Sequence, residues 1–313
     1  MTVAGEHHHN HSHQHEHIHS GHQHHSPNSF NLSFAIAVAL NLIFVIAEII
    51  YALMANSMTL LADAAHNFGD VFGLLLAWGA NWLLSFPARK RYSYGYKRIT
   101  ILASLANALI LVATSALIAF EAIYKIFHLS PVNEEIVMIV AAIGIVINGG
   151  TSLLFMRGIH EDLNIKGAFL HLAADALIAA GVVLTGALIW YTQKLWLDPA
   201  ISLLLVFIVL WGAWKLLRDS VRLLLDAIPH YIDHSGISEY LSQLPGVTAI
   251  HDLHIWGMST REIALTAHLI MPELRLSDAD YERINTHLKQ KFRVDHVTLQ
   301  IETGSTAFPC EGC

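Results

Sequence analysis

Six long apolar stretches follow one another along the first two thirds of the chain, and they constrain the fold more than any other feature. Each is close to the ~20 residues that an α-helix needs to cross a hydrocarbon core of ~30 Å at ~1.5 Å per residue. The sequence therefore predicts an all-α membrane bundle of six helices. We place them at Phe34–Met54, Leu60–Leu84, Ile99–Phe127, Ile136–Met156, Gly167–Tyr191 and Pro199–Leu217.

The composition agrees with a protein in contact with the lipid bilayer. Of the residues, 54% are hydrophobic and 14% are charged, whereas soluble domains contain roughly 25% charged residues. Charged residues are sparse up to Leu217 and reach an ordinary density from Asp226 onward. We therefore expect a polar tail at 1–31, a transmembrane domain at 32–222 and a water-facing domain at 223–313.

The tail is rich in histidine. Residues 7 to 25 include eleven histidines among Ser, Gln, Asn and Glu, a composition that cannot bury enough apolar surface to fold. We expect a disordered cytosolic segment that collects metal ions. The alternative is a purification tag, although a tag is normally an unbroken run of histidines. No cleaved targeting segment is expected before the first helix.

Lysine and arginine predict the orientation, because cytoplasmic loops of membrane proteins carry an excess of both. One side of the predicted bundle has only Lys125 and Lys194. Both termini are therefore expected in the cytoplasm, and the short loops favour a bacterial inner membrane over a eukaryotic organelle. The richer side carries Arg89, Lys90, Arg91, Lys97, Arg98, Arg157, Lys166, Lys215, Arg218 and Arg222.

The last ninety residues predict a small α+β domain. A polar helix at Ile232–Leu244 ends at a Pro-Gly pair, and Ser277-x-x-Asp280 is a capping signal for a second helix that runs to Phe292. Three stretches rich in β-formers surround the second helix, and one of them alternates apolar and polar residues. The order helix, strand, strand, helix, strand predicts a sheet with helices on one face. The strands are expected at Thr248–Trp256, Ile263–Met271 and Val297–Glu302.

Two matching His-x-x-x-Asp motifs lie inside apolar helices: His66 with Asp70, and His171 with Asp175. Positions i and i+4 share a helix face, so each helix presents one imidazole and one carboxylate in the same direction. Two such helices supply the two nitrogens and two oxygens of a tetrahedral zinc site. The alternative is an interhelical hydrogen bond between a histidine and an aspartate. A carboxylate at membrane depth costs roughly 2.5 to 3.5 kcal/mol, and two such carboxylates, each with a histidine partner, favour a metal site over that alternative.

Two further acidic residues lie in the predicted bundle. Asp63 is three residues before His66 and therefore on the same helix face. It could accept the ring N–H of His66, line the path of the ion, or serve only the helix end. Glu48 in the first helix could carry protons or line a cavity, although interhelical hydrogen bonding is the more common use of such a residue.

The water-facing domain contains a second set of candidate ligands. His251 and His268 lie on strands that could be neighbours, and Glu302 ends the third strand. Cys310 and Cys313 form a two-thiolate claw that suits zinc or copper. A lone Cys-x-x-Cys also serves redox chemistry, but no thioredoxin-like context surrounds it, and two cysteines are too few for a disulfide framework.

Four segments together resemble the cation diffusion facilitator family, in the order that the family has them and with its zinc-exporting branch as the nearest match. The resemblance covers the chain from about Leu32 to Glu302. The segments are LLADAAHNFGD at 60–70, YGYKR at 94–98, HLAAD at 171–175 and HDLHIW at 251–256.

The resemblance implies a homodimeric zinc/proton antiporter with six membrane helices and a cytosolic metallochaperone-like, ferredoxin-like domain. It places the transport site on His66, Asp70, His171 and Asp175. It also implies zinc ligands at His251 and His268, with Asp295 and Glu302 near the positions of further ligands, while Cys310 and Cys313 match a cysteine pair of some members. Zinc would then be both the substrate and a structural or regulatory ion.

Zinc binding needs neutral imidazole and ionised carboxylate, so protons and zinc compete for the same side chains, and antiport by alternating access follows. We therefore expect a secondary active transporter, with zinc ions, protons and lipid as partners and no nucleic acid. Another preferred metal, such as cadmium, cobalt or iron, is the first alternative, whereas manganese favours oxygen ligands. An intramembrane metalloenzyme would need an open metal position and a general base that the sequence lacks. A membrane-tethered zinc buffer or sensor is the third alternative.

Overall fold

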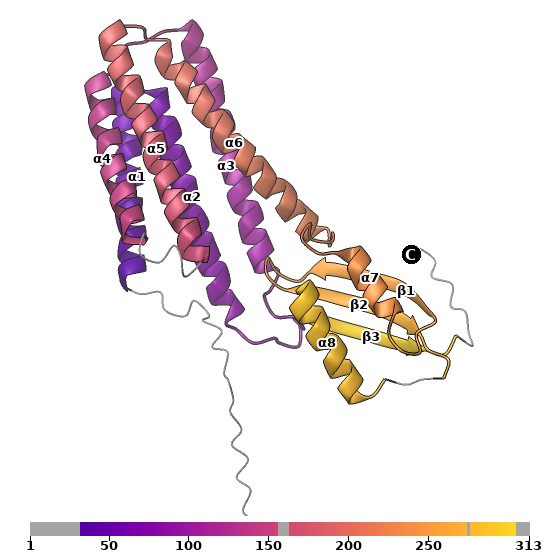
Figure 1. Ribbon diagram of the computed structural model, residues 1–313. Helices are drawn as coiled ribbons and strands as arrows, with labels where there is room; N and C mark the ends of the chain where they lie inside the picture. Colours follow the sequence, from indigo (N-terminus) through magenta and orange to yellow (C-terminus); the bar gives the residue numbers. More distant parts are fainter. Residues whose placement is uncertain (1–31, 156–162, 274–275, 305–313) are drawn as a thin grey trace, which may run out of the picture.

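The computed structural model describes residues 32–155, 163–273 and 276–304, with side chains except at 32–37, 154–155 and 163–171. Six long helices are followed by a small domain with a three-stranded sheet (Figure 1). The predicted histidine-rich tail and the terminal cysteines lie outside the described residues. The long helices are α1 Leu32–Ala55, α2 Met58–Leu84, α3 Ile99–Phe127, α4 Glu134–Phe155, α5 Leu163–Thr192 and α6 Leu197–Leu224.

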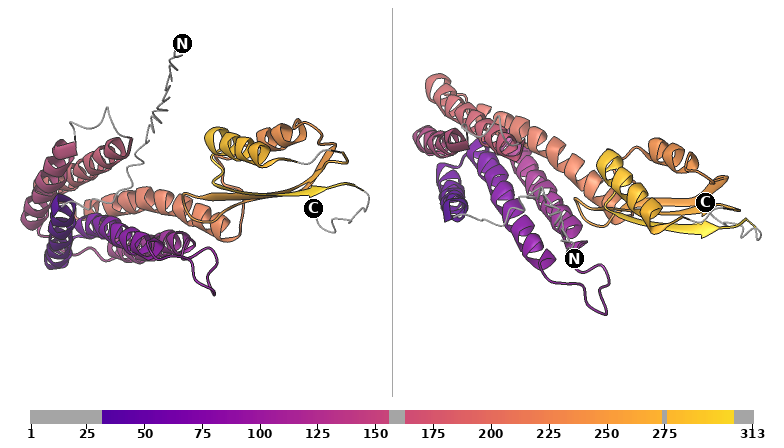
Figure 2. Two further views of the ribbon diagram at one scale, coloured as in Figure 1. Left: turned by 90° about the horizontal axis from the view of Figure 1, so that it is seen from below. Right: turned by 60° about the horizontal axis from the view of Figure 1, so that its bottom comes forward.

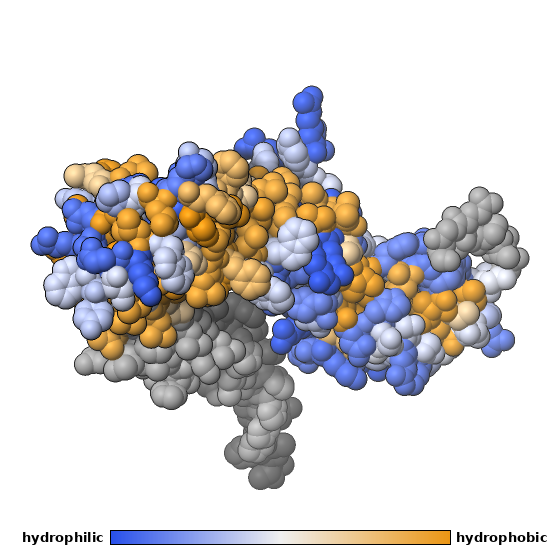
Figure 3. Space-filling view, turned by 90° about the horizontal axis from the view of Figure 1, so that it is seen from above, coloured by the Kyte–Doolittle hydropathy of each residue, from blue (hydrophilic) through white to orange (hydrophobic). Residues whose placement is uncertain are grey.

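The six long helices coincide with the six predicted apolar stretches, and five of them are long and apolar enough to cross a membrane. The exception within the described residues is α2, whose polar residues, Asp63, His66, Asn67 and Asp70 among them, lower its hydropathy. Large apolar side chains such as Leu117, Phe120 and Trp211 point outward from the bundle. Figure 3 shows hydrophobic residues gathered over the helices and hydrophilic ones over much of the C-terminal domain.

The helices pack unevenly. α4 lies along α5, α3 lies along α6, and α2 contacts α1, α3 and α6. The contact of α2 with α5 is small by comparison. In Figure 1 α3 and α6 lean away from the other helices toward the C-terminal domain.

Two glycines let α2 and α3 approach closely. A Cβ atom on Gly69 would lie 2.1 Å from Leu111 Cδ2, and one on Gly73 would lie 2.7 Å from Asn107 Nδ2. Gly69 and Gly73 are four residues apart on α2, and Asn107 and Leu111 are four residues apart on α3, so one face of α2 meets one face of α3. Small residues at this spacing are a common means of helix packing in membranes.

A buried aspartate joins the first turn of α2 to α6. Asp198 accepts hydrogen bonds from the Ser57 hydroxyl at 2.5 Å, the Met58 N–H at 2.6 Å and the Thr59 N–H at 3.2 Å. The Thr59 hydroxyl donates to the Asp198 carbonyl at 2.6 Å. The first N–H groups of a helix have no partner within it. Asp198 from another helix accepts those of Met58 and Thr59, and the N-cap residue Ser57 accepts that of Leu60 at 3.2 Å.

The C-terminal domain has the predicted order of elements. β1 pairs antiparallel with β2, and β2 pairs parallel with β3. Both helices cover the same face of the sheet (Figure 2). The predicted alternation is confirmed, because Ile263, Leu265, Ala267, Leu269 and Met271 are all buried. The elements are α7 His234–Ser242, β1 Ala249–Gly257, β2 Ile263–Ile270, α8 Asp278–Phe292 and β3 His296–Glu302.

The predicted capping signal of α8 is also confirmed. The Ser277 hydroxyl accepts from the Asp280 N–H at 3.3 Å, and the Asp280 carboxylate accepts from the Ser277 N–H at 2.9 Å. This reciprocal pair is a capping box, which uses two backbone donors that the helix leaves free. The helix ends at Arg293, whose φ of 60° is left-handed.

Candidate metal centres

Three of the four predicted transport ligands lie together inside the helix bundle. His66 and Asp70 are one turn apart on α2, and Asp175 reaches them from α5. His66 Nε2 lies 3.6 Å from Asp70 Oδ2 and 3.4 Å from Asp175 Oδ1, and one ligand atom of each residue lies within 4.8 Å of the others. Asp175 is buried, with 4% of its surface exposed.

These separations suit a tetrahedral metal ion. Zinc bonds of ~2.0 to 2.2 Å set the ligand atoms of a tetrahedron ~3.3 to 3.6 Å apart. Both His66 distances fall in or near this range. The donor set of one nitrogen and two carboxylate oxygens is one that zinc accepts.

The fourth predicted ligand, His171, lies on α5 one turn before Asp175, but its side chain is outside the described residues. At i and i+4 the two residues share one face of α5. The helix therefore allows His171 to complete the group, and its role as a ligand stays a prediction.

A second polar cluster lies beside this group. Glu48 on α1 is fully buried, and its Oε2 accepts a hydrogen bond from Asn67 Nδ2 at 3.0 Å. The carboxyl group of Asp63 is buried and is close enough to Glu48 and to His66 to interact with both electrostatically. Both acidic residues thus face the bundle interior and connect α1 with the predicted ligands. The sequence predicts no role for Asn67.

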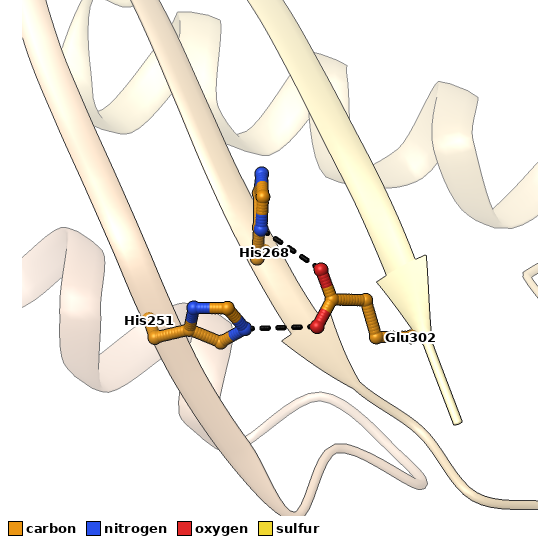
Figure 4. Close-up of side chains that lie close together, drawn as sticks. All are labelled: His251, His268 and Glu302. Carbon is orange, nitrogen blue, oxygen red and sulfur yellow. Dashed lines mark hydrogen bonds and ion pairs between the residues drawn. The ribbon is translucent and has the colours of Figure 1, made fainter. Parts of the chain in front are cut away.

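The C-terminal domain brings His251, His268 and Glu302 together. The three side chains come from three adjacent strands and point toward one another (Figure 4). His251 Nε2 lies 3.0 Å from Glu302 Oε2, and His268 Nδ1 lies 2.9 Å from Glu302 Oε1. The hydrogen bond with His251 lowers the pKa of the Glu302 carboxyl, and a bond from Gln300 acts in the same direction. Two imidazoles and a carboxylate could hold a metal ion on the sheet face opposite the helices.

A β-bulge in β1 extends this group. The register shifts between His251 and His254, and Asp252 between them has a left-handed φ of 55°. The extra residue turns His254 to the same face as His251. Asp252 then lies 2.7 Å from His254 Nε2 and 3.4 Å from His268 Nε2. An aspartate in a strand carries no signal of a bulge, so only the structure places Asp252 here.

The structure does not bring Asp295 into this group. Its carboxylate accepts from the Ile263 N–H at 3.2 Å, at the start of β2. Asp295 comes just before β3 and Glu302 ends it, so the extended strand sets them ~23 Å apart at ~3.3 Å per residue. Cys310 and Cys313, predicted as further ligands, lie outside the described residues.

Comparison with known proteins identifies the family. The family model described as cation efflux transmembrane domain matches residues 34–225, and the one described as cation efflux protein, cytoplasmic domain, matches residues 229–304. The chain is 33% identical to the metal cation efflux system protein CzcD of Cupriavidus metallidurans over 278 residues, which are 87% of this chain and 85% of that protein.

Two further relatives are similar over comparable lengths. The cadmium, cobalt and zinc/H(+)-K(+) antiporter of Bacillus subtilis is 32% identical over 83% of this chain and 85% of its own length. The zinc transporter ZitB of Escherichia coli is 31% identical over 86% of this chain and 85% of its own length. These matches decide against the metalloenzyme alternative. The chain is a multi-pass membrane transporter and belongs to the cation efflux family, the cation diffusion facilitators, in the metal-exporting branch that its sequence resembles.

Proposed function

We propose that this protein exports zinc, exchanging cytosolic Zn²⁺ for protons by alternating access. The observation that carries the proposal is the convergence of His66, Asp70 and Asp175 from two helices at separations that suit a tetrahedral ion. With His171 the site has two nitrogen and two oxygen ligands. An ion here is cargo, because the group lies between helices that make few other contacts with each other.

Proton exchange follows from the ligand chemistry. Imidazole binds zinc only when neutral, and carboxylates bind it when ionised, so protons and zinc exclude each other from the same atoms. Cytosolic zinc displaces protons from the ligands, the helices reorient, and protons from the far side displace zinc. We assign Glu48 and Asp63 to the path of these protons or to the wall of a cavity, since both are buried and Asp63 lies near both Glu48 and His66.

Zinc is the preferred ion in this proposal, with cadmium, cobalt and iron as the alternatives. One relative is named as a zinc transporter, and another as a cadmium, cobalt and zinc antiporter. Imidazole nitrogen and carboxylate oxygen together suit zinc, whereas softer ions prefer sulfur ligands. Competitive uptake of radiolabelled metals by the wild type and by His66→Asp would rank the ions directly.

The proposal includes the arrangement of the chain in the membrane. All six long helices cross the bilayer, α2 with its polar face turned inward, and both termini are cytoplasmic. The 1–31 tail collects zinc, residues 32–222 transport it, and residues 223–313 form a cytoplasmic domain that joins two copies into a homodimer. The order α7, β1, β2, α8, β3 equals a ferredoxin-like unit without its first strand. His251, His268 and Glu302 hold a structural or regulatory zinc ion there.

Flux into sealed vesicles tests the transport site. Purified wild-type protein in liposomes should move zinc when a pH gradient is imposed, and Asp175→Ala should reduce zinc flux to the background of empty vesicles. The matched control is Thr185→Val on the same helix, because the buried Thr185 hydroxyl bonds only to the Gly181 carbonyl among the described residues. This variant should transport normally. Zinc flux that ignores the pH gradient, or that survives in Asp175→Ala, would contradict the proposal.

A further inference from the structure

A cavity of about 520 Å³ connects the transport site with the cytoplasmic domain. It is lined by Asp70 at one end and by the loop between β1 and β2, residues 259–262, at the other. Since a water molecule takes ~30 Å³ of liquid volume, this space has room for a cation with several of its waters. The cavity therefore links one of the predicted ligands to a part of the chain that the transmembrane helices do not contain.

Polar groups line this cavity between its two ends. Asn81 on α2 and Ser104 and Asn107 on α3 contribute side chains to its wall. Gly73 leaves the space in which the Asn107 amide lies against α2. The Asn107 Oδ1 atom is buried and has no hydrogen-bond partner among the described residues. An amide oxygen in this state, in the same cavity wall as Asp70, is an acceptor for a water of the passing ion.

The loop at the far end has hydrogen bonds of its own and is tied to the helices. Ser259 Oγ accepts from the Arg261 and Glu262 N–H groups at 3.1 and 2.9 Å. The Thr260 N–H donates to Thr100 Oγ1, at the start of α3, at 3.1 Å. Lys97, just before α3, forms an ion pair with Glu262. Glu262, which lines the cavity, is thus paired with Lys97 of the segment between α2 and α3.

We propose that the 259–262 loop forms the cytoplasmic mouth of the cation's access route, and that the Lys97–Glu262 ion pair is a latch across it. The inference rests on the proposed function, because it takes the cavity to lead to the transport site. Both members of the pair are partly exposed, and such pairs are weak enough to open thermally. When the latch opens, the Glu262 carboxylate faces the mouth and attracts a divalent cation, while Lys97 repels it.

Accessibility of the cavity is the first test. The chain has two cysteines, Cys310 and Cys313, so changing both to serine and introducing Ser104→Cys gives one reporter thiol in the cavity wall. The probe is a small uncharged methanethiosulfonate, applied to full-length protein in liposomes without zinc, so that its reaction reports the opening of the pair and not the charge left behind. Lys97→Gln and Glu262→Gln should each speed its reaction about two- to fivefold, the range expected for loss of an exposed ion pair. The charge-swapped double variant Lys97→Glu with Glu262→Lys should restore the slow rate.

The matched control lies at the same junction. Arg98 pairs with Asp226 at 2.7 Å, but neither residue lines this cavity. Arg98→Gln should therefore leave the labelling rate of the reporter unchanged. Equal rates in Lys97→Gln and wild type, or an equal increase in Arg98→Gln, would overturn the latch.

Transport kinetics give the second test, because the two single variants should move KM in opposite directions. An unpaired unit charge ~7 Å from a divalent ion changes its local concentration about fivefold at 10 mM salt and about twofold at 150 mM salt. Lys97→Gln should lower the KM for zinc by these factors and Glu262→Gln should raise it, with the maximal rate unchanged. KM values that move together, or that ignore salt, would refute the role of the pair.

The two proposals fail in different ways. If Asp175→Ala still transports zinc, the transport site is wrong, and the labelling result for the mouth stands by itself. If Asp175→Ala is inactive while Lys97→Gln and Glu262→Gln match the wild type in labelling and in KM, the transport site holds and the latch does not.

Discussion

Replacing Asp198 should strongly destabilise the protein. The carboxylate accepts from the Ser57 hydroxyl and from the Met58 and Thr59 N–H groups in a buried position. Each hydrogen bond to a charged group contributes ~1.5 to 3 kcal/mol, and buried donors left without an acceptor cost ~1 to 3 kcal/mol each. Because water can enter partly at a helix end, we expect Asp198→Ala to lose about 4 kcal/mol. Asp198→Asn keeps one acceptor oxygen and should lose about half as much.

Thermal unfolding of the purified protein in detergent measures this loss. A change of 1 kcal/mol shifts Tm by about 2 to 4 °C for a domain of this size, so Asp198→Ala should lower Tm by about 8 to 16 °C. Hydrogen exchange should also become faster at the amides of residues 58–60. Asp219→Asn, on the same helix and without a side-chain hydrogen bond among the described residues, serves as control and should change the free energy of unfolding by less than ~0.5 kcal/mol. A Tm for Asp198→Ala within 2 °C of the wild type would refute the assignment of α2's cap to Asp198.

Two further predictions concern helix packing and the cytoplasmic metal group. Gly69→Ala places a methyl group against Leu111 Cδ2 and should cost about 1 to 3 kcal/mol in unfolding free energy. Adding Leu111→Ala to this variant should relieve part of that loss. Equal Tm values for the single variant Gly69→Ala and the double variant would contradict the close contact. Equilibrium dialysis of His268→Ala or Glu302→Gln should show one zinc ion fewer per chain than the wild type or the control His230→Ala. Removal of zinc by a chelator should destabilise the domain by about 3 kcal/mol relative to zinc at 100 times its Kd. An unchanged number of zinc ions per chain in the two variants would exclude a site at these residues.

The sequence predicts the elements of this fold better than the contacts between them. Apolar length places six helices, and the Ser277-x-x-Asp280 signal marks α8, because these features depend on neighbouring residues alone. The i, i+4 spacing likewise places His66 beside Asp70. The distance of Asp175 from His66 depends on how α2 and α5 pack, which no local pattern contains.

Contacts between distant residues account for what the sequence did not predict. Asp198 stands at the start of α6 and would be expected to cap its own helix, yet it caps α2, about 140 residues earlier. Asp252 adopts a left-handed conformation that aspartate tolerates, but the presence of an aspartate does not predict it. The family resemblance implied that Asp295 lies near the cytoplasmic ligands, but the extended strand β3 separates it from Glu302 and places it at the other end of the sheet.

The weak packing of α2 against α5 has a mechanical consequence. α2 is fastened to α6 through Asp198 and to α3 through its glycines, while α5 packs mainly along α4, and the two parts share an apolar cluster that includes Leu60 of α2 and Val182 of α5. A cation held by Asp70 and Asp175 would act as a removable cross-link between those parts, tightening the protein when loaded and loosening it on release. The transported ion would thereby control how freely the two parts of the transporter move against each other.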